Sequence, residues 1–229
     1  MQSIRHMQSP IIFLLAASAS LGGSYAQARQ PIVTITYDAA IDAQCASDRR
    51  VPIPQDWTAE LMSRREEFDN LWKTLGPKMI HAAETVTGKS FSGGSITARL
   101  TLCDLPSQSS DEITINMRYA LRSFTATPVP MRYKVDTLFH ELLHVFLTEH
   151  PVKESALLEQ YNSEPERTKD HLHLLALQKA VLLRLNEEAS LKNVISIDSQ
   201  LPGGYYKRAW DIIDAKNDEY LKYVAEISR

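Results

Sequence analysis

The sequence predicts an α+β protein that is mainly helical and has a small N-terminal β-sheet. Short segments of alternating β-branched residues occur in the first half of the chain, and longer segments with apolar residues at helical spacing dominate the second half. One of these helices contains the pattern His-Glu-x-x-His at residues 140–144. We expect it to pack on a second, buried helix at residues 168–185.

Residues 1–28 have the pattern of an export signal. A weakly basic start at Arg5 and His6 precedes an apolar run at residues 11–21, and small residues follow where a signal peptidase cuts. The run is too short to span a membrane. We therefore expect a periplasmic or secreted protein with no stable membrane anchor after cleavage, and a single domain over residues 29–229.

The charge pattern argues against a nucleic-acid partner. The formal net charge is −3, and loss of residues 1–28 removes one charged residue, Arg5, which makes it −4. Basic residues are scattered along the chain, and no platform of aromatic residues with arginines is present.

The chain has two cysteines, Cys45 and Cys103. In an oxidising compartment the simplest arrangement of a pair is one disulfide, which would tie the N-terminal segment to a later strand. Two free thiols and metal ligation are the alternatives. Ligation is disfavoured because each cysteine stands alone rather than in a closely spaced pair.

The first elements expected along the chain are a strand and two helices. Residues 32–37 alternate and are β-branched, which predicts a strand, and a polar loop follows. Residues 57–75 have helical spacing. Gly76-Pro77 is expected to end this helix before another begins at residues 78–87.

Two strands are expected immediately before the His-Glu-x-x-His helix. Residues 96–103 and residues 113–117 both alternate in polarity, with a polar loop between them. We expect these two strands to form a hairpin.

The rest of the chain is predicted to be helical. A short helix is expected at residues 154–161, and the most apolar helix of the chain at residues 168–185. A Pro-Gly-Gly turn at residues 202–204 then precedes a final amphipathic helix at residues 205–227.

The strongest functional signal is the His-Glu-x-x-His pattern itself. Residues i and i+4 of a helix lie on one face, so the imidazoles of His140 and His144 can converge on one metal ion. Glu141 lies near the same face, where it can reach a metal-bound water. Chance matches are expected at a frequency on the order of 1% for this composition. His140 and His144 are the predicted metal ligands, and Glu141 is the predicted catalytic residue.

A third ligand is expected downstream, because a catalytic zinc ion usually takes three protein ligands and keeps one position for water. His171 and His173 both lie on the predicted buried helix, but about 200° apart, so only one can face the metal. His173 shares its face with the charged Arg184, which marks that face as the wetter one. His171 is therefore the preferred third ligand.

Glu164 and His150 are further candidates besides His173. Glu164 lies 20 residues after His144, but it precedes Pro165 in a polar segment where no helix is expected. His150 lies six residues after His144. On a continuous helix that is about 9 Å along the axis and about 120° around it, which keeps His150 away from a metal ion held by His144.

The sequence at residues 140–144 resembles the active helix of the zincin metallopeptidases, in an arrangement closer to gluzincins than to metzincins. The glycine of the metzincin pattern is Leu147 here, and no methionine follows Met131. The whole chain also resembles uncharacterised exported bacterial proteins that bear this motif.

The resemblance implies a zincin-like domain over residues 29–229, Zn²⁺ as cofactor, and hydrolysis of a peptide or protein substrate. Glu141 would be general base and then proton donor, while zinc activates water and polarises the carbonyl. The resemblance also implies that a substrate strand pairs with the sheet edge at residues 113–117. Two other interpretations stay open, namely a catalytically silent zincin-like protein that acts in binding or regulation, and a metal-free structural helical protein.

Four side chains are candidates for supporting roles. Asp136 or Asp170 can accept the second N–H of a ligating histidine, although each also suits a helix start. Tyr205 or Tyr206, which follow the Gly-Gly turn, can stabilise an oxyanion, although aromatic packing is the alternative for both.

Overall fold

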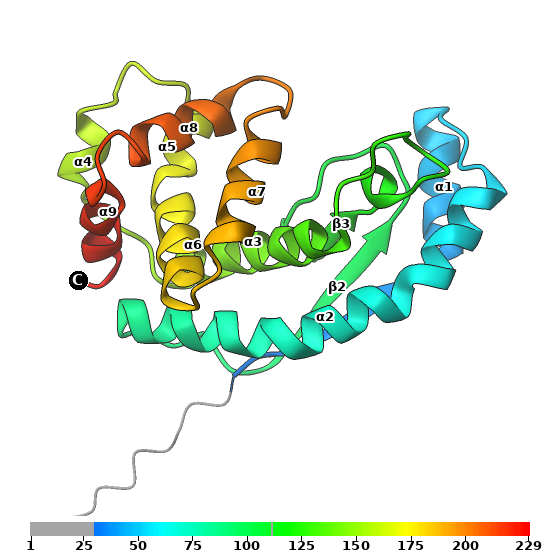
Figure 1. Cartoon of the computed structure of the whole chain (residues 1–229), viewed down its shortest axis with the longest axis horizontal. Coiled ribbons are helices and arrows are strands. Elements are labelled where there is room, and N and C mark those ends of the chain that lie inside the picture. Colours follow the sequence, from blue (N-terminus) through cyan, green and yellow to red (C-terminus); the bar gives the residue numbers. More distant parts are fainter. Residues whose placement is uncertain (1–29, 111) are drawn as a thin grey trace, which may run out of the picture.

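The computed structural model describes residues 30–110 and 112–229, and helices make up most of them (Figure 1). In chain order the elements are β1 (Ile32–Tyr37), α1 (Ala39–Arg49), α2 (Gln55–Thr87), β2 (Ser95–Thr101), β3 (Ile113–Asn116), the 3₁₀ turn η1 (Arg118–Ala120), α3 (Met131–Glu149), α4 (Ala156–Glu159), α5 (Glu166–Asp170), α6 (Leu172–Arg184), α7 (Glu188–Asp198), α8 (Tyr205–Ile213) and α9 (Glu219–Ile227). The expectation of an α+β, mainly helical chain is confirmed. The predicted export signal at residues 1–28 lies outside the described residues.

The strands of the described residues form one parallel sheet in the order β1-β2-β3. Ile35 of β1 lies opposite Ala98, and Leu100 of β2 lies opposite Ile115. The predicted hairpin of β2 and β3 is therefore wrong. Alternating polarity decides which face of a strand is buried but not the direction of the strand, and residues 102–112 are long enough to return the chain to the start of a parallel neighbour.

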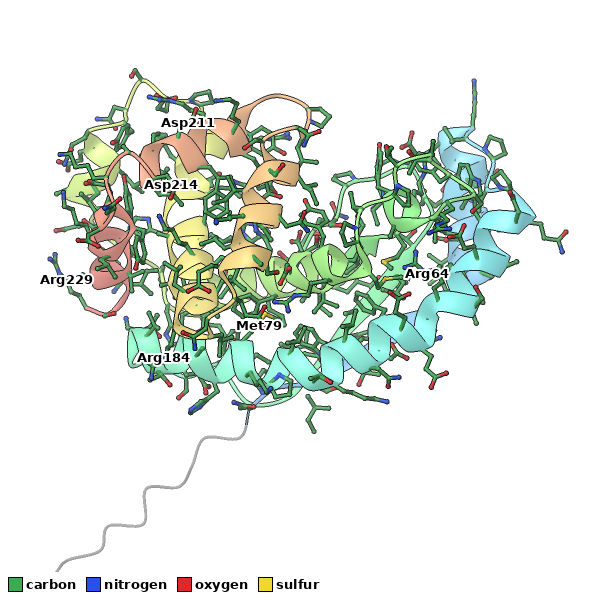
Figure 2. The ribbon with its side chains drawn as sticks, viewed as in Figure 1. Arg64, Met79, Arg184, Asp211, Asp214 and Arg229 are labelled. Carbon is green, nitrogen blue, oxygen red and sulfur yellow. A yellow bond between two sulfur atoms is a disulfide. The ribbon has the colours of Figure 1, made fainter. Side chains whose placement is uncertain are left out.

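A single long helix, α2, occupies the segment that was predicted to hold two helices divided at Gly76-Pro77. Gly76 has a packing role, because a Cβ there would lie 2.6 Å from the ring of Trp72. Met79, beyond the proline, is fully buried on the side of α2 that faces the rest of the protein (Figure 2). Burial on both sides of the Gly-Pro pair offsets the hydrogen bond that Pro77 cannot donate.

Helices α3 and α6 lie at the centre of the helical part and pack on each other. α6 also contacts α2, α8 and α9, so it is buried on almost all sides, as the sequence predicts. The helix predicted at residues 168–185 is divided at His171 into α5 and α6, and the one at residues 205–227 is divided into α8 and α9. α7 lies where no element was predicted.

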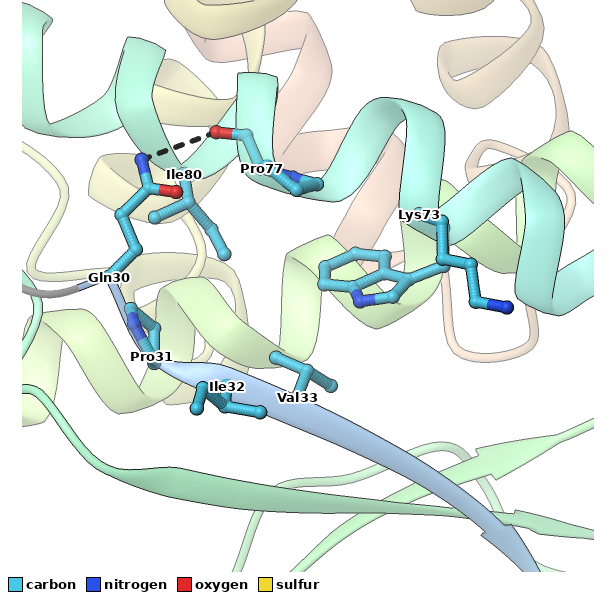
Figure 3. A pocket seen from close by; sticks show the side chains of 8 residues that line it. Gln30, Pro31, Ile32, Val33, Lys73, Pro77 and Ile80 are labelled. Carbon is cyan, nitrogen blue, oxygen red and sulfur yellow. Dashed lines mark hydrogen bonds between the residues drawn. The ribbon is translucent and has the colours of Figure 1, made fainter.

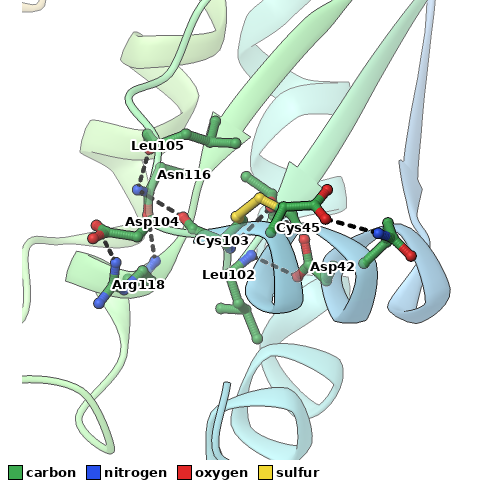
Figure 4. Close-up of a disulfide and its surroundings, with 11 residues drawn as sticks. Asp42, Cys45, Leu102, Cys103, Asp104, Leu105, Asn116 and Arg118 are labelled. Atoms are coloured by element: carbon green, nitrogen blue, oxygen red, sulfur yellow. Dashed lines mark hydrogen bonds and ion pairs between the residues drawn. A yellow bond between two sulfur atoms is a disulfide. The ribbon is translucent and has the colours of Figure 1, made fainter. Parts of the chain in front are cut away.

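Helix α1 lies where a polar loop was predicted. A hydrogen bond and a disulfide join it to the residues that follow β2 (Figure 4). Asp38 caps its first turn by accepting a hydrogen bond from the backbone N–H of Ala40 at 2.8 Å. The buried carboxylate of Asp42 accepts a hydrogen bond from the Leu102 N–H at 2.7 Å. Nearby, Cys45 and Cys103 form the predicted disulfide, with Cα atoms 6.0 Å apart.

A shallow depression of about 250 Å³ lies between the start of β1 and α2 (Figure 3). Gln30 spans it and donates a hydrogen bond from Nε2 to the Pro77 carbonyl at 3.4 Å. Its lining is mostly apolar, and it contains none of the predicted site residues. The lining residues are Gln30, Pro31, Ile32, Val33, Trp72, Lys73, Pro77 and Ile80. Among the helices of residues 30–110 and 112–229, none has the length and apolar character to cross a membrane.

Replacing Cys45 and Cys103 together by serine is expected to lower the free energy of unfolding. The two residues are 58 positions apart. Closing a loop of that size lowers the conformational entropy of the unfolded chain, which stabilises the folded state by about 4 kcal/mol. Chemical denaturation of the oxidised protein and of the double variant measures the difference. Dithiothreitol should destabilise the wild type and leave the variant unchanged; equal sensitivity of the two proteins would contradict the disulfide.

Candidate metal centre

The His-Glu-x-x-His residues lie on α3, which is largely buried. It begins directly after Pro130, whose fixed φ suits a helix entry, and it continues to Glu149. The rings of His140 and His144, one turn apart, have centroids 5.0 Å from each other. His140 is buried and His144 is partly exposed, so this side of α3 approaches solvent at His144.

His171 joins these two residues from the junction of α5 and α6. Its ring centroid lies 5.5 Å from that of His140 and 5.2 Å from that of His144. One nitrogen from each of the three side chains lies within 4.8 Å of the others. The three imidazoles could therefore hold one metal ion, and imidazole is a good ligand for zinc, copper, iron and nickel alike.

Hydrogen bonds orient two of the three rings. Nδ1 of His140 lies 3.2 Å from Oε1 of Gln178 on α6, and Nδ1 of His171 lies 2.6 Å from the Arg167 carbonyl oxygen. Both oxygens can only accept, so each Nδ1 carries the proton and each Nε2 keeps the lone pair that a metal ion would require. Gln178 and Arg167 are hydrogen-bond partners of these histidines that the sequence did not reveal.

Asp136, which was predicted as a partner of a ligating histidine, is linked to the His140 ring through Gln178 rather than directly. Its carboxylate accepts hydrogen bonds from Ser190 at 2.8 Å and from Arg132 at 3.0 Å. Its backbone carbonyl instead accepts from Nε2 of Gln178 at 3.5 Å. Asp170 is exposed, and no hydrogen bond joins it to a histidine ring among the described residues.

The surroundings keep the three imidazoles uncharged near neutral pH. Burial, reinforced by the neighbouring imidazoles, holds the pKa of His140 well below its usual value. Burial also lowers the pKa of His144 to about 4 and reduces the pKa of His171. Neutral imidazole is the form that binds metal ions.

Glu141 is buried beside this cluster, with 4% of its surface exposed. Burial raises the pKa of its carboxyl group to about 7, and a hydrogen bond with the Ser109 side chain opposes the rise. A carboxyl group that titrates near neutrality can both accept and release a proton at physiological pH.

Tyr206 of α8 reaches the same cluster. Its hydroxyl lies 3.4 Å from Nε2 of His140, and its ring centroid lies 4.6 Å from that of His171. Burial, with the nearby charge of Glu141, raises the pKa of Tyr206, so the hydroxyl remains a hydrogen-bond donor. Tyr205, the other candidate, stacks against Tyr206 at 4.7 Å.

The alternative third ligands have other partners. His150 ends α3, and its Nε2 lies 2.8 Å from the Ser90 carbonyl oxygen. Glu164 accepts hydrogen bonds from Arg208 at 2.6 and 2.8 Å.

The fourth candidate, His173, points away from the cluster toward α9. Its Nε2 lies 2.8 Å from the carboxylate of Glu226. The expectation that His173 is on a wetter face than His171 is wrong, because 6% of His173 and 8% of His171 is exposed. The two histidines differ in their partners, because His173 has a buried carboxylate, that of Glu226, to bond with.

The sheet edge at β3 is not free, in contrast to the expectation for residues 113–117. Gln108 and Thr114 pair antiparallel through N–H···O bonds of 2.8 and 3.0 Å. The N–H of Asn116 donates to the Ser107 hydroxyl at 3.0 Å. Residues 107–109 thus cover β3 beside Glu141, and a substrate strand would have to displace them or pair elsewhere.

Comparison of the chain with protein-family models, with curated proteins and with solved structures finds no match. The case for a function therefore rests on the residues and their geometry.

Replacing His171 by alanine is expected to weaken zinc binding by more than about a hundred-fold, because only two imidazoles of the cluster remain. Competition with a chromophoric chelator measures the affinity. The control is His150→Ala, which should bind zinc like the wild type because His150 contacts Ser90 instead. Undiminished affinity in His171→Ala would show that His171 is not a ligand.

Proposed function

We propose that the protein is an exported zinc metallopeptidase with a zincin-like domain over residues 29–229. It hydrolyses peptide bonds of a peptide or protein substrate. The observation that carries the proposal is the convergence of His140, His144 and His171 beside the buried Glu141. Export is inferred from the sequence pattern before this domain.

The donor set suits zinc. Three neutral imidazoles match the ligand number of a hydrolytic zinc site, in which a fourth position stays open to water or substrate. Gln178 and Arg167 fix two of the rings through Nδ1, so these ligands need little rearrangement on binding. A bound zinc ion supplies Lewis-acid activation of water and of the scissile carbonyl.

The protein's own groups then move protons and stabilise charge. Glu141 accepts a proton from the attacking water and passes it to the nitrogen of the leaving amine. Its pKa of about 7 suits both transfers near neutral pH. The Tyr206 hydroxyl, which stays protonated, donates a hydrogen bond to the substrate oxygen as negative charge develops there.

Replacing Glu141 by glutamine is expected to abolish cleavage without loss of zinc. The variant keeps the shape of the side chain but cannot accept a proton, so the rate should fall at least about 10²- to 10⁴-fold. Hydrolysis of a fluorophore-labelled unstructured polypeptide and the zinc content of the same samples provide the measurements.

The outcomes separate the competing functions. A wild type that binds no zinc would favour a metal-free structural protein, and one that binds zinc but cleaves nothing would favour a silent binding protein. Equal cleavage by the wild type and Glu141→Gln would show that the proposed mechanism is wrong.

Replacing Tyr206 by phenylalanine is expected to lower kcat roughly 10²- to 10³-fold, the usual cost of removing one oxyanion donor. Zinc affinity should be unchanged, because the ring that packs on His171 is retained. Steady-state kinetics and chelator competition test both statements. A change in KM alone would mean that Tyr206 acts in substrate binding rather than in charge stabilisation.

A further inference from the structure

Lys134, in the first turn of α3, is a buried cation that has no counter-ion among the described residues. Only 5% of its surface is exposed, and its ammonium group forms no hydrogen bond or ion pair with residues 30–110 or 112–229. The rings of Tyr119 and Tyr133 lie beside it, with centroids 5.9 and 5.7 Å from Nζ. Burial of an unpaired charge is unfavourable, so the position requires an explanation.

Three other buried or half-buried cations of the described residues have acidic partners. Arg118 pairs with Asp104, and Lys179 pairs with Asp214. Arg132, two residues before Lys134, pairs with Asp136 and with Glu187. These cations are neutralised by carboxylates, whereas no carboxylate of residues 30–110 or 112–229 pairs with Lys134.

Helix geometry places Lys134 on the same side of α3 as the catalytic carboxyl group. Lys134 precedes Glu141 by seven residues, which is about 10.5 Å along the axis and about 20° around it. Tyr133 likewise precedes His140 by seven residues, so these two also lie on one side of α3. Thr137, between the two pairs, is partly exposed, so solvent reaches this side of the helix.

The neighbours of Lys134 also connect it to the metal cluster. The hydroxyl of Tyr133 donates to Asp198 at 2.7 Å, and Tyr206 is close enough that its charge would contribute to raising the pKa of Tyr133. On the other side of Lys134, the ring of Tyr119 is 52% exposed and borders solvent. Lys134 thus has one neighbouring ring that is coupled to Tyr206 of the cluster and another that is at the surface.

We propose that Lys134 binds a carboxylate of the peptide substrate. This inference rests on the proposed peptidase function. The carboxylate belongs either to an acidic side chain or to the C-terminus of the substrate.

The chemistry of the position favours a single negative charge. Arg118 and Arg132 are already paired, so one ammonium group remains for the ligand, which suits a carboxylate better than a doubly charged phosphate. Burial lowers the pKa of Lys134 to about 8, and the group is still mostly protonated at neutral pH. The apolar rings around it strengthen an ion pair by excluding water.

The test measures peptide binding without cleavage. In a Glu141→Gln background, loaded with zinc, fluorescence anisotropy compares labelled octapeptides that have glutamate or glutamine at each position. Each peptide is made with a free and with an amidated C-terminus. We expect one carboxylate position to tighten binding about 10- to 100-fold, the usual range for a charge-assisted hydrogen bond.

Adding Lys134→Gln should remove that preference and leave the neutral peptides unaffected. The matched control, Lys153→Gln, changes an exposed lysine and should keep the preference. Loss of the preference on amidation identifies the C-terminal carboxylate as the ligand, and its persistence identifies an acidic side chain.

Lys134→Gln should also raise the melting temperature, because it removes an unpaired buried charge. No preference for any carboxylate peptide, or equal weakening of acidic and neutral peptides by Lys134→Gln, would overturn the proposal. A Lys134-dependent preference in a protein whose wild type cleaves nothing would instead leave this site standing and refute the peptidase function.

Discussion

The contact between α3 and α6 is the interaction on which the candidate site depends. Gln178 of α6 accepts a hydrogen bond from Nδ1 of His140 and donates one to the Asp136 carbonyl, so it fixes both the ring and the helix that bears it. His171 immediately precedes α6. The registry of the two helices therefore sets the orientation of one imidazole and the position of another. A shift of one residue between them would disrupt the cluster.

The parts of the fold that follow from local pattern were predictable. The buried α6 and the pairing of Cys45 with Cys103 follow from composition and spacing. The direction of β3 could not be predicted, because the alternation of its residues is the same in either direction. The continuity of α2 through Pro77 depends on side chains that pack from elsewhere, which outweigh the local preference for a break.

In the candidate site, too, local spacing was predictable and long-range contacts were not. The spacing of His140 and His144 is a property of any helix, so their proximity could be predicted without the fold. His171 was preferred over His173 on the evidence of Arg184, but both histidines are buried. What distinguishes them is Glu226, 53 residues after His173, and no local pattern reveals such a distant partner.

The covering of β3 by residues 107–109 also bears on self-association. A sheet edge with unpaired backbone groups invites strand exchange with another molecule. Among the described residues β1 is the other edge strand; Ile32 there is 70% exposed, while the Ile35 carbonyl accepts a hydrogen bond from Arg65 of α2. Any growth of the sheet between molecules would therefore begin two strands away from the edge that lies beside α3. The edge open to sheet extension and the segment that borders Glu141 are thus on opposite sides of the sheet.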